Sequence, residues 1–232
     1  LGELEATSCL AEMYQKGRLV EEDFKESARL HKIASDSIEF RRTEDGLEWG
    51  TSQDKKLLFI RGRGRIEDNF TRGCDTKASV RSLFIFDELK SIGNSSFQGF
   101  SGLERVSIPS SMTTIGTTPF ANCSCLKSID ISGNNPNFLS EDGVLFNKAK
   151  TLLILYPPAK NGAYEVPSGV KEIGNRAFYQ CTALTKITLP KSLKQIGVSA
   201  FEDCSTLKSV AHKSHLDAIM RRAFYNCSNL YS

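Results

Sequence analysis

The sequence predicts an α/β solenoid, in which a curved parallel sheet faces a short helical or irregular convex side, with one inserted β-hairpin and an N-terminal α-helical hairpin. Three observations lead to this prediction. A 23-residue motif recurs along the C-terminal part of the chain, each copy has a strand-like and a helix-like half, and the first 36 residues follow a different, helical pattern. A unit of this size cannot close a core alone, so the units must stack on one another.

The first 36 residues are expected to form two amphipathic helices that meet near Gly17. Their apolar residues recur at helical spacing on both sides of this glycine. One helical pair buries too little surface to fold alone, because about three such repeats are usually required. We therefore expect the pair to be the last unit of a longer helical array, docked on the N-terminal end of the solenoid and joined to it through residues 37–46.

The repeat is most visible in a column of isoleucines. Each isoleucine is followed five residues later by a phenylalanine and six residues after that by a leucine. The steps between the isoleucines are 23, 58, 23 and 23 residues, and the long step equals one unit plus an insertion of 35 residues. Several columns that repeat in register are a strong signal of stacked units. The isoleucines are Ile92, Ile115, Ile173, Ile196 and Ile219.

Each unit has two halves. In "LTKITL" (184–189), apolar and polar residues alternate as in a half-buried strand, and Pro190 then ends the strand. In the half that follows, I-G-x-x-A-F-x-x-C-x-x-L, the apolar residues are three or four apart, which suits one or two helical turns. The glycine after the isoleucine permits a tight bend between the halves. Stacked strands of this kind predict a curved parallel sheet of the leucine-rich-repeat type.

The unit "LTKITLPKSLKQIGVSAFEDCST" (184–206) resembles the repeat of the BspA-like leucine-rich repeat family. The segment "GVLFNKAKTLLILYPP" (143–158) looks like an insertion that is common in that family, and it is expected to form a hairpin around Asn147–Lys150. Upstream, "KKLLFIRGRGRIEDNF" (55–70) resembles the irregular first strands that cap the open end of the core in that family. The resemblance covers roughly residues 47–232.

The N-terminal segment, about residues 3–36, resembles a Sel-one-like, tetratricopeptide-related repeat. Ala11 and Ser27 depart from that family's usual glycine and alanine. Together the two resemblances predict three regions: a Sel-one-like repeat at 1–36, a junction with irregular cap strands at 37–88, and BspA-like repeats at 89–232 with an insertion near 136–169. The Sel-one-like resemblance is carried by Ala6, Leu10, Tyr14, Gly17, Val20, Asp23 and Ala34.

Composition excludes several classes of partner. The chain has 232 residues, 25% of them charged, and a formal net charge of +3. Nucleic-acid binding would require basic residues clustered on one face, and no run approaches the ~18–20 apolar residues of a membrane-spanning helix. We therefore expect no nucleic-acid partner and no membrane contact by this segment. Because the chain begins at Leu1 rather than Met, we expect a piece of a longer protein, so the missing signal peptide says little about its compartment.

Four of the seven cysteines occupy one column of the repeat, three residues after the phenylalanine. In the first unit this position is Phe100, which a ligand or nucleophile column would not accept but a buried apolar position would. We therefore expect buried, reduced thiols. A disulfide between neighbouring members of the column stays open, because strands stacked at about 4.8 Å bring them close together. The cysteines of the column are Cys123, Cys181, Cys204 and Cys227.

No other pattern indicates chemistry. Cys204, His212 and His215 lie within twelve residues, but their spacing does not match the paired ligands of a structural zinc site. The run "RGRGR" (61–65) is too short for a nucleic-acid segment and is expected to be a solvated strand end. The three histidines fall in no known catalytic motif, and no phosphate-binding glycine loop is present. We expect no catalytic residue, no metal and no cofactor.

A binding function is therefore predicted for the concave sheet face, where polar residues lie between the apolar ones of each strand. The BspA-like resemblance implies a cell-surface, adhesin-like protein that binds a protein partner of unknown identity. The Sel-one-like segment favours an alternative, an intracellular scaffold or regulatory segment of a larger protein such as a kinase. The candidate binding residues are Glu104, Arg105, Ser107, Lys127, Ser128, Asp130, Thr185, Lys186, Thr188, Lys208 and Ser209.

Overall fold

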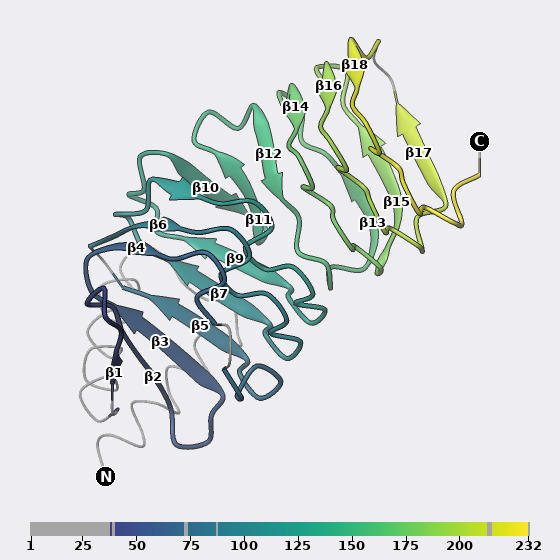
Figure 1. Ribbon diagram of the computed structural model, residues 1–232. Coiled ribbons are helices and arrows are strands. Elements are labelled where there is room, and N and C mark those ends of the chain that lie inside the picture. Colours follow the sequence, from purple (N-terminus) through teal and green to yellow (C-terminus); the bar gives the residue numbers. More distant parts are fainter. Residues whose placement is uncertain (1–37, 39, 72–73, 87, 213–214, 232) are drawn as a thin grey trace.

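The computed structural model describes residues 38, 40–71, 74–86, 88–212 and 215–231. These residues form a β-solenoid of about seven turns, and none of them is helical. The turns lie one on the next along an elongated body, from the N-terminal to the C-terminal end (Figure 1). Each turn contributes strands to two walls, and apolar side chains from both walls fill the space between them.

One wall of the N-terminal half is a six-stranded sheet with the order β1-β2-β3-β5-β7-β9. Its first three strands are antiparallel, whereas each later strand pairs in parallel with the strand one turn earlier. The three antiparallel strands therefore form the N-terminal edge of this sheet, before the parallel strands of the repeats. The strands are β1 (Arg41–Arg42), β2 (Glu48–Thr51), β3 (Leu57–Arg61), β5 (Ser82–Ile85), β7 (Arg105–Ile108) and β9 (Ser128–Ile131).

The corresponding wall of the C-terminal half is a separate three-stranded parallel sheet, β13-β15-β17. The second wall is also divided in two, into a sheet β4-β6-β8 and a sheet in which β12, β14, β16 and β18 pair in parallel. These strands are β4 (Gly64–Ile66), β6 (Leu89–Ile92), β8 (Thr114–Ile115), β12 (Leu152–Leu155), β13 (Gly162–Glu165), β14 (Glu172–Ile173), β15 (Leu184–Leu189), β16 (Gln195–Ile196), β17 (Ser209–His212) and β18 (Ala218–Ile219).

The 23-residue repeat sets the register of the parallel pairs. Val106 pairs with Ile129 across β7 and β9, and Ile187 pairs with Val210 across β15 and β17. In both pairs the partners are 23 residues apart, so one sequence unit is one turn of the solenoid. The repeat predicted from the sequence is confirmed.

The insertion contains three antiparallel strands, β10 (Phe138–Glu141), β11 (Val144–Asn147) and β12. The hairpin expected around Asn147–Lys150 is the β11–β12 connection, and Lys150 adopts a left-handed φ of 54° within it. Strand β10 is an additional element that the sequence pattern did not predict. Through β12 the insertion joins the second wall of the C-terminal half, so it forms part of the solenoid rather than a loop outside it.

Strand β11 divides the interior into two hydrophobic cores. Successive side chains of a strand point to opposite faces. Leu145 accordingly belongs to the N-terminal core, while Val144 and Phe146 belong to the C-terminal core, and all three are fully buried. The insertion is therefore a partition between two stacks of turns.

The prediction of an α/β solenoid is wrong, because the supposed helical half of each unit is a series of turns. Residues four apart in these turns, such as Ser199 and Asp203, have φ angles of 53° and 63°, which a right-handed helix cannot contain. Backbone N–H groups in this half of the unit bond to the next turn of the solenoid rather than within a helix. For example, Phe178 N–H donates to Ala200 O at 2.8 Å. Apolar residues three or four apart thus reach the core from consecutive tight turns of the backbone. Sequence spacing alone does not distinguish this arrangement from a helix.

The N-terminal α-helical hairpin and the Sel-one-like repeat were predicted for residues 1–36, which lie outside the described residues. The described structure therefore gives these predictions no support. Across the described ranges, no helix has the length and hydrophobicity needed to cross a membrane.

Candidate functional site

The sheet face, defined as the outward side of β5, β7, β9, β13, β15 and β17, carries the predicted binding residues. In β7 the side chains of Val106 and Ile108 are fully buried, and those of Arg105 and Ser107 face outward and are half-buried. Strand β9 repeats this alternation one turn later. The two strands and the residues before them form the N-terminal patch: Glu104, Arg105, Ser107, Lys127, Ser128 and Asp130.

Glu104 is at the centre of a small charge network in the N-terminal patch. Its Oε2 atom accepts from Lys127 Nζ at 2.9 Å, and its Oε1 atom lies 4.0 Å from Arg81 Nε. The three side chains come from three consecutive turns. Because all three are partly exposed, each pair contributes only about 0–1 kcal/mol to stability. The network orients charge on the surface more than it stabilises the fold.

Asp130 is an acid of the N-terminal patch whose pKa is shifted. Burial raises the pKa of its carboxyl group, while a hydrogen bond from Ser128 Oγ, at 2.8 Å, and the positive charge of Arg105 oppose the rise. Ser107 pairs with Asp130 across the two strands, and Arg105 pairs with Ser128. The patch therefore holds one partly desolvated carboxylate between hydroxyl groups and a guanidinium group.

The C-terminal patch lies on β15 and β17 and has no carboxylate among its predicted residues. Lys186 is exposed and pairs with Ser209 on the next strand. Lys208 N–H donates to Thr185 O at 2.9 Å, which fixes the approach to β17. This patch is a row of hydroxyl and ammonium groups: Thr185, Lys186, Thr188, Lys208 and Ser209.

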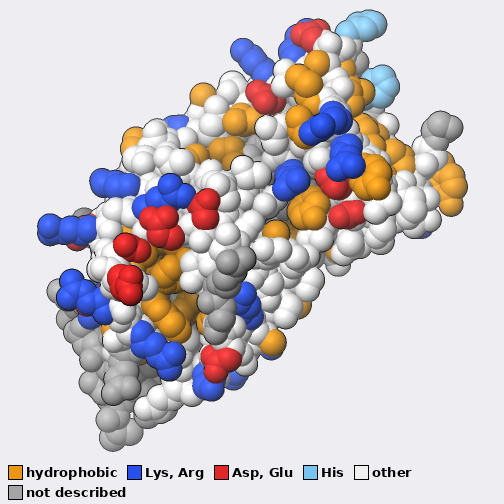
Figure 2. Space-filling model, in the orientation of Figure 1, with side chains coloured by type: hydrophobic (Ala, Val, Ile, Leu, Met, Phe, Trp, Pro, Cys, Tyr) orange, Lys and Arg blue, Asp and Glu red, His pale blue; other side chains and the backbone are white. Residues whose placement is uncertain are grey.

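The structure does not bring the eleven predicted residues into one sheet. Strand β9 ends the first sheet and β13 begins another, so the insertion lies between the two patches. Ser140 Oγ donates to Ile129 O at 2.5 Å, and a Cβ atom on Gly143 would lie 2.7 Å from Ser128 Oγ. The β10–β11 turn therefore abuts β9 directly. Figure 2 shows basic and acidic side chains interspersed over one face of the molecule, with apolar side chains between them.

An aromatic cluster on the first turns was not identified from the sequence. Phe59 and Phe84 point away from the main core, and their rings stack with centroids 5.3 Å apart. Ile38 and Phe40 pack on them, and the Arg61 guanidinium lies 3.8 Å from the centre of the Phe40 ring. The signal was present in the sequence, since the runs at 57–61 and 82–86 are apolar at every position between their ends and do not alternate. Such strands are buried on both faces.

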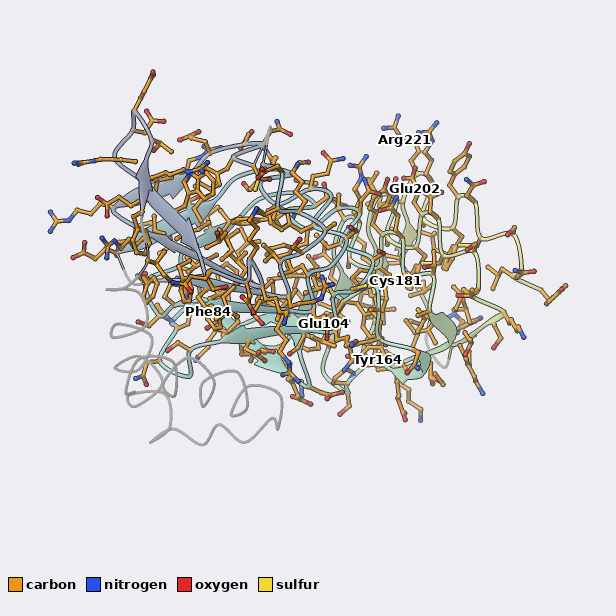
Figure 3. The ribbon with its side chains drawn as sticks, turned by 90° about the horizontal axis from the view of Figure 1, so that it is seen from below. Phe84, Glu104, Tyr164, Cys181, Glu202 and Arg221 are labelled. Atoms are coloured by element: carbon orange, nitrogen blue, oxygen red, sulfur yellow. The ribbon has the colours of Figure 1, made fainter. Side chains whose placement is uncertain are left out.

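The cysteine column lies inside the solenoid. Figure 3 shows Cys181 in the interior, between the side with Glu104 and Tyr164 and the side with Glu202 and Arg221. Cys204 Sγ donates to Phe178 O at 3.0 Å, and Cys123 Sγ donates to Phe97 O at 3.2 Å, so each thiol bonds to the preceding turn. The cysteines of the described part are free thiols. The pKa of Cys204 is raised, mainly by a hydrogen bond with Cys181 and to a smaller extent by burial.

Metal ligation has no support within the described ranges, where no group of three or more His, Cys, Asp and Glu side chains is arranged to hold an ion. Cys204 is fully buried, whereas His212 and His215 are exposed at and beyond the end of β17. The zinc grouping considered from the sequence is thus divided between the interior and the surface.

A groove opens on the turn side of the solenoid where the insertion interrupts the repeats. It has a volume of about 630 Å³. Its lining includes the buried residues Phe120, Cys123 and Tyr156, together with polar residues from several turns. The sequence did not predict this groove, because it depends on how the insertion crosses the solenoid. The polar lining residues include Thr118, Asn122, Ser124, Arg176, Gln180, Thr182, Asp203, Ser205, Asn226 and Ser228.

Comparison with known families identifies the repeats. The family described as "BspA type Leucine rich repeat region" matches in six copies, over residues 69–151 and 160–232. The gap between these ranges coincides with β12 and the segment that follows it. None of the curated proteins compared with the chain matches it.

Among solved structures, the pneumococcal vaccine antigen PcpA is 29% identical to the chain with a TM-score of 0.54. The match covers 66% of this chain but only 39% of the PcpA chain. A leucine rich cell surface protein from Faecalibacterium prausnitzii A2-165 is 18% identical, with a TM-score of 0.44 and coverage of 85% of this chain and 88% of that one. A leucine-rich repeat protein from Eubacterium ventriosum is 20% identical, with a TM-score of 0.38 and coverage of 79% and 74%.

Proposed function

Because the chain belongs to the BspA-type leucine-rich repeat family, we propose that it is a non-catalytic module that binds a protein partner through its sheet face. Leucine-rich repeat proteins generally act in this way, since stacked turns multiply one shallow surface patch. The observation that carries the proposal is the N-terminal patch, where charged and hydroxyl side chains stand in register on adjacent parallel strands.

The chemistry of the sheet face suits a partner with acidic and hydroxyl groups. Arg105 and Lys127 contribute positive charge to the N-terminal patch, and Lys186 and Lys208 contribute it to the C-terminal patch. Neither patch contains a large exposed aromatic residue among its predicted members. Because interface energy concentrates in buried aromatic and arginine anchors, binding through this face is expected to be of modest affinity.

An adhesin-like role is the more specific form of the proposal. It is supported by the family, and by the similarity to PcpA, which is named as a vaccine antigen. The chain spans 39% of the PcpA chain, so the activity of that whole protein is not transferred to this one. The partner we propose is an extracellular-matrix protein.

Charge reversal on the sheet face tests the proposal. The chain is passed over a panel of immobilised extracellular-matrix proteins, and the dissociation constant is measured for each. We expect at least one matrix protein to bind, and binding to weaken by tenfold or more when Arg105, Lys127, Lys186 and Lys208 are all changed to Glu. A matched control carries the same charge change on exposed residues that lie off the sheet face: Lys90, Lys171, Lys194 and Arg221.

The control separates a specific face from a general charge effect. Equal weakening of both variants would contradict the assignment of the sheet face, because net charge alone would then explain the loss. Absence of binding to every matrix protein would contradict the adhesin-like role.

A further inference from the structure

Two rows of polar side chains contribute to the lining of the groove. The first row lies two residues after the repeat phenylalanine, and its members end in planar amide or carboxylate groups: Gln180, Asp203 and Asn226. The second row lies four residues after the phenylalanine, and its members carry hydroxyl groups: Thr182, Ser205 and Ser228. We call these the planar row and the hydroxyl row.

The two rows repeat at the spacing of the solenoid turns. The phenylalanine rings of the same turns stack with centroids 4.7 and 5.0 Å apart. Gln180, Asp203 and Asn226 have φ angles of 59°, 63° and 59°, so the backbone has the same conformation at each member of the planar row. The rows therefore present similar groups at regular steps along the axis of the solenoid.

Both rows continue on the other side of the insertion. Asn122 and Ser124 occupy the same two repeat positions and also line the groove. The Gln180 Oε1 atom accepts from Asn122 N–H at 3.2 Å, which links the two parts of the planar row. The insertion adds Pro158 to the lining, so residues from five turns take part.

Much of the hydrogen-bonding capacity of the rows is unused. Among the described residues, no partner is present for the hydroxyl groups of Thr182, Ser205 and Ser228. Asp203 Oδ1 accepts from Asn226 Nδ2 at 3.0 Å, which leaves the second carboxylate oxygen of Asp203 for another donor. A hydroxyl group both donates and accepts. The rows can therefore bond to a ligand that carries many hydroxyl groups.

The charge of the groove favours an uncharged ligand. Among the described residues that line it, Arg176 and Asp203 are the charged ones, and their charges are opposite. Apolar side chains, including Phe120, Leu155 and Tyr156, make up another part of the lining. A neutral sugar matches this mixture, because its hydroxyl groups bond to polar side chains and its C–H groups pack on apolar ones.

The step between turns distinguishes between classes of linear polymer. An extended peptide advances by 3.2–3.4 Å per residue, so consecutive peptide residues do not stay in step with the turns. A single-stranded nucleic acid requires a positively charged groove, which this one is not. A pyranose residue in a linear polysaccharide advances by close to the distance between two turns. Successive sugars can therefore meet the same pair of groups on successive turns.

We propose that the groove binds a neutral, linear polysaccharide that lies along the solenoid axis with one sugar residue opposite each turn. The hydroxyl groups of each sugar bond to one member of the planar row and one member of the hydroxyl row. The volume of about 630 Å³ lies within the range of roughly 300–1,000 Å³ for ligand pockets. This site is distinct from the sheet face and does not depend on the function proposed for that face.

Unbranched oligosaccharides of two to eight residues provide the probes, in four series: cello-, manno-, laminari- and malto-oligosaccharides. Isothermal titration calorimetry of the intact chain measures each dissociation constant. We expect at least one series to bind, with an affinity that rises with length and levels off at about five residues, one for each turn that lines the groove. Absence of binding by all four series, or an affinity independent of length, would overturn the proposal.

A bulky substitution locates the binding site. Thr182→Trp fills the middle of the hydroxyl row and should weaken binding by tenfold or more. The matched control is Ala78→Trp, which places the same bulk at an exposed residue in the same repeat position, in a turn that does not line the groove. It should leave binding unchanged. Equal binding by Thr182→Trp and the unmodified chain would overturn the proposal.

A double variant tests the planar row itself. Asp203 and Asn226 bond to each other, so changing both to Ala removes two members of the row without leaving either of them unpaired. We expect binding to weaken by tenfold or more while the urea midpoint stays close to that of the unmodified chain. Unchanged sugar binding would show that the planar row is not part of the site.

A charged polysaccharide tests the neutrality of the ligand. Heparin is titrated under the same conditions, at low and at high salt. We expect it to bind more weakly than the preferred neutral series. Tighter binding of heparin that is lost at high salt would overturn the proposal of a neutral ligand, because screening weakens contacts between exposed charges. Charge reversal on the sheet face should leave binding of the neutral oligosaccharides unchanged.

Discussion

Tyr156 stacks on Phe178 with ring centroids 4.8 Å apart, in the position that a repeat phenylalanine would occupy. Beyond Phe178 the column continues with centroid distances of 4.7 Å to Phe201 and 5.0 Å from there to Phe224. A tyrosine from the insertion therefore begins the aromatic stack of the C-terminal half. Each such pair contributes about 0.5–1.5 kcal/mol beyond the burial of its surface. The insertion is thus integrated into the core although it lacks the repeat sequence.

The aromatic stack should dominate the stability of the C-terminal half. Phe201 is fully buried between two other rings, so Phe201→Ala is expected to lower the free energy of unfolding by about 3–5 kcal/mol. Tyr225→Ala removes a side chain that is 50% exposed and should change it by no more than about 0.5 kcal/mol. Urea denaturation of both variants checks the difference, and similar losses would contradict the role of the stack.

Two cysteines that are two residues apart should differ in reactivity. Burial raises the pKa of Cys123 to about 12, whereas Cys125 is exposed. The thiolate is the reactive form, so at pH 8 Cys123 should react with iodoacetamide slower than Cys125 by a factor on the order of 100 or more. Mass spectrometry of the native chain measures both rates. Comparable rates would show that the column is not buried, whereas in urea both cysteines should react quickly.

How much of this structure the sequence predicted depends on which interactions its patterns report. Alternation of apolar and polar residues correctly located strands such as 184–189, and the 23-residue spacing correctly gave the pairing register. The helical interpretation failed because spacing does not report φ, and residues such as Gln180, at 59°, adopt the left-handed conformation inside each turn. A series of tight backbone turns and a short helix can place the same residues in the core.

The candidate site was predicted less well than the repeats. The outward positions of the strands followed from alternation, but their division into two patches did not, because it depends on how β10 and β11 pack beside β9. The groove was not predictable from any motif, because its lining comes from several turns of the solenoid. Local patterns report what one segment contains, whereas the groove forms between turns that are 58 residues apart in sequence, such as those of Asn122 and Gln180.

Asp130 should make the chain less stable at neutral pH than its asparagine variant. Burial raises the pKa of Asp130 in the folded state, so ionisation of this carboxyl group disfavours folding. The stability associated with the protonated form is present below the ordinary value of 3.8 and is lost as the pH rises through the raised value. Asp130→Asn is therefore expected to raise the urea midpoint at pH 7, and the gain should disappear below about pH 3.8.

The control for this prediction is Asp45→Asn, which changes an exposed aspartate in the loop before β2. It should leave the urea midpoint within error at both pH values. A lower midpoint for Asp130→Asn at pH 7 would mean that the ionised carboxylate stabilises the patch, through Arg105 and Ser128, by more than its desolvation costs.

The most direct test of the account is amide hydrogen exchange where the insertion interrupts the backbone hydrogen bonds between successive turns of the solenoid. Ser95 and Phe97 donate their N–H groups to the next turn, at 3.2 and 2.9 Å, whereas the equivalent groups of Thr118 and Phe120 have no acceptor among the described residues. We predict that Thr118 and Phe120 exchange at least tenfold faster than Ser95 and Phe97 under native conditions. Equal protection at all four amides would contradict the interruption of the backbone hydrogen bonds between these turns.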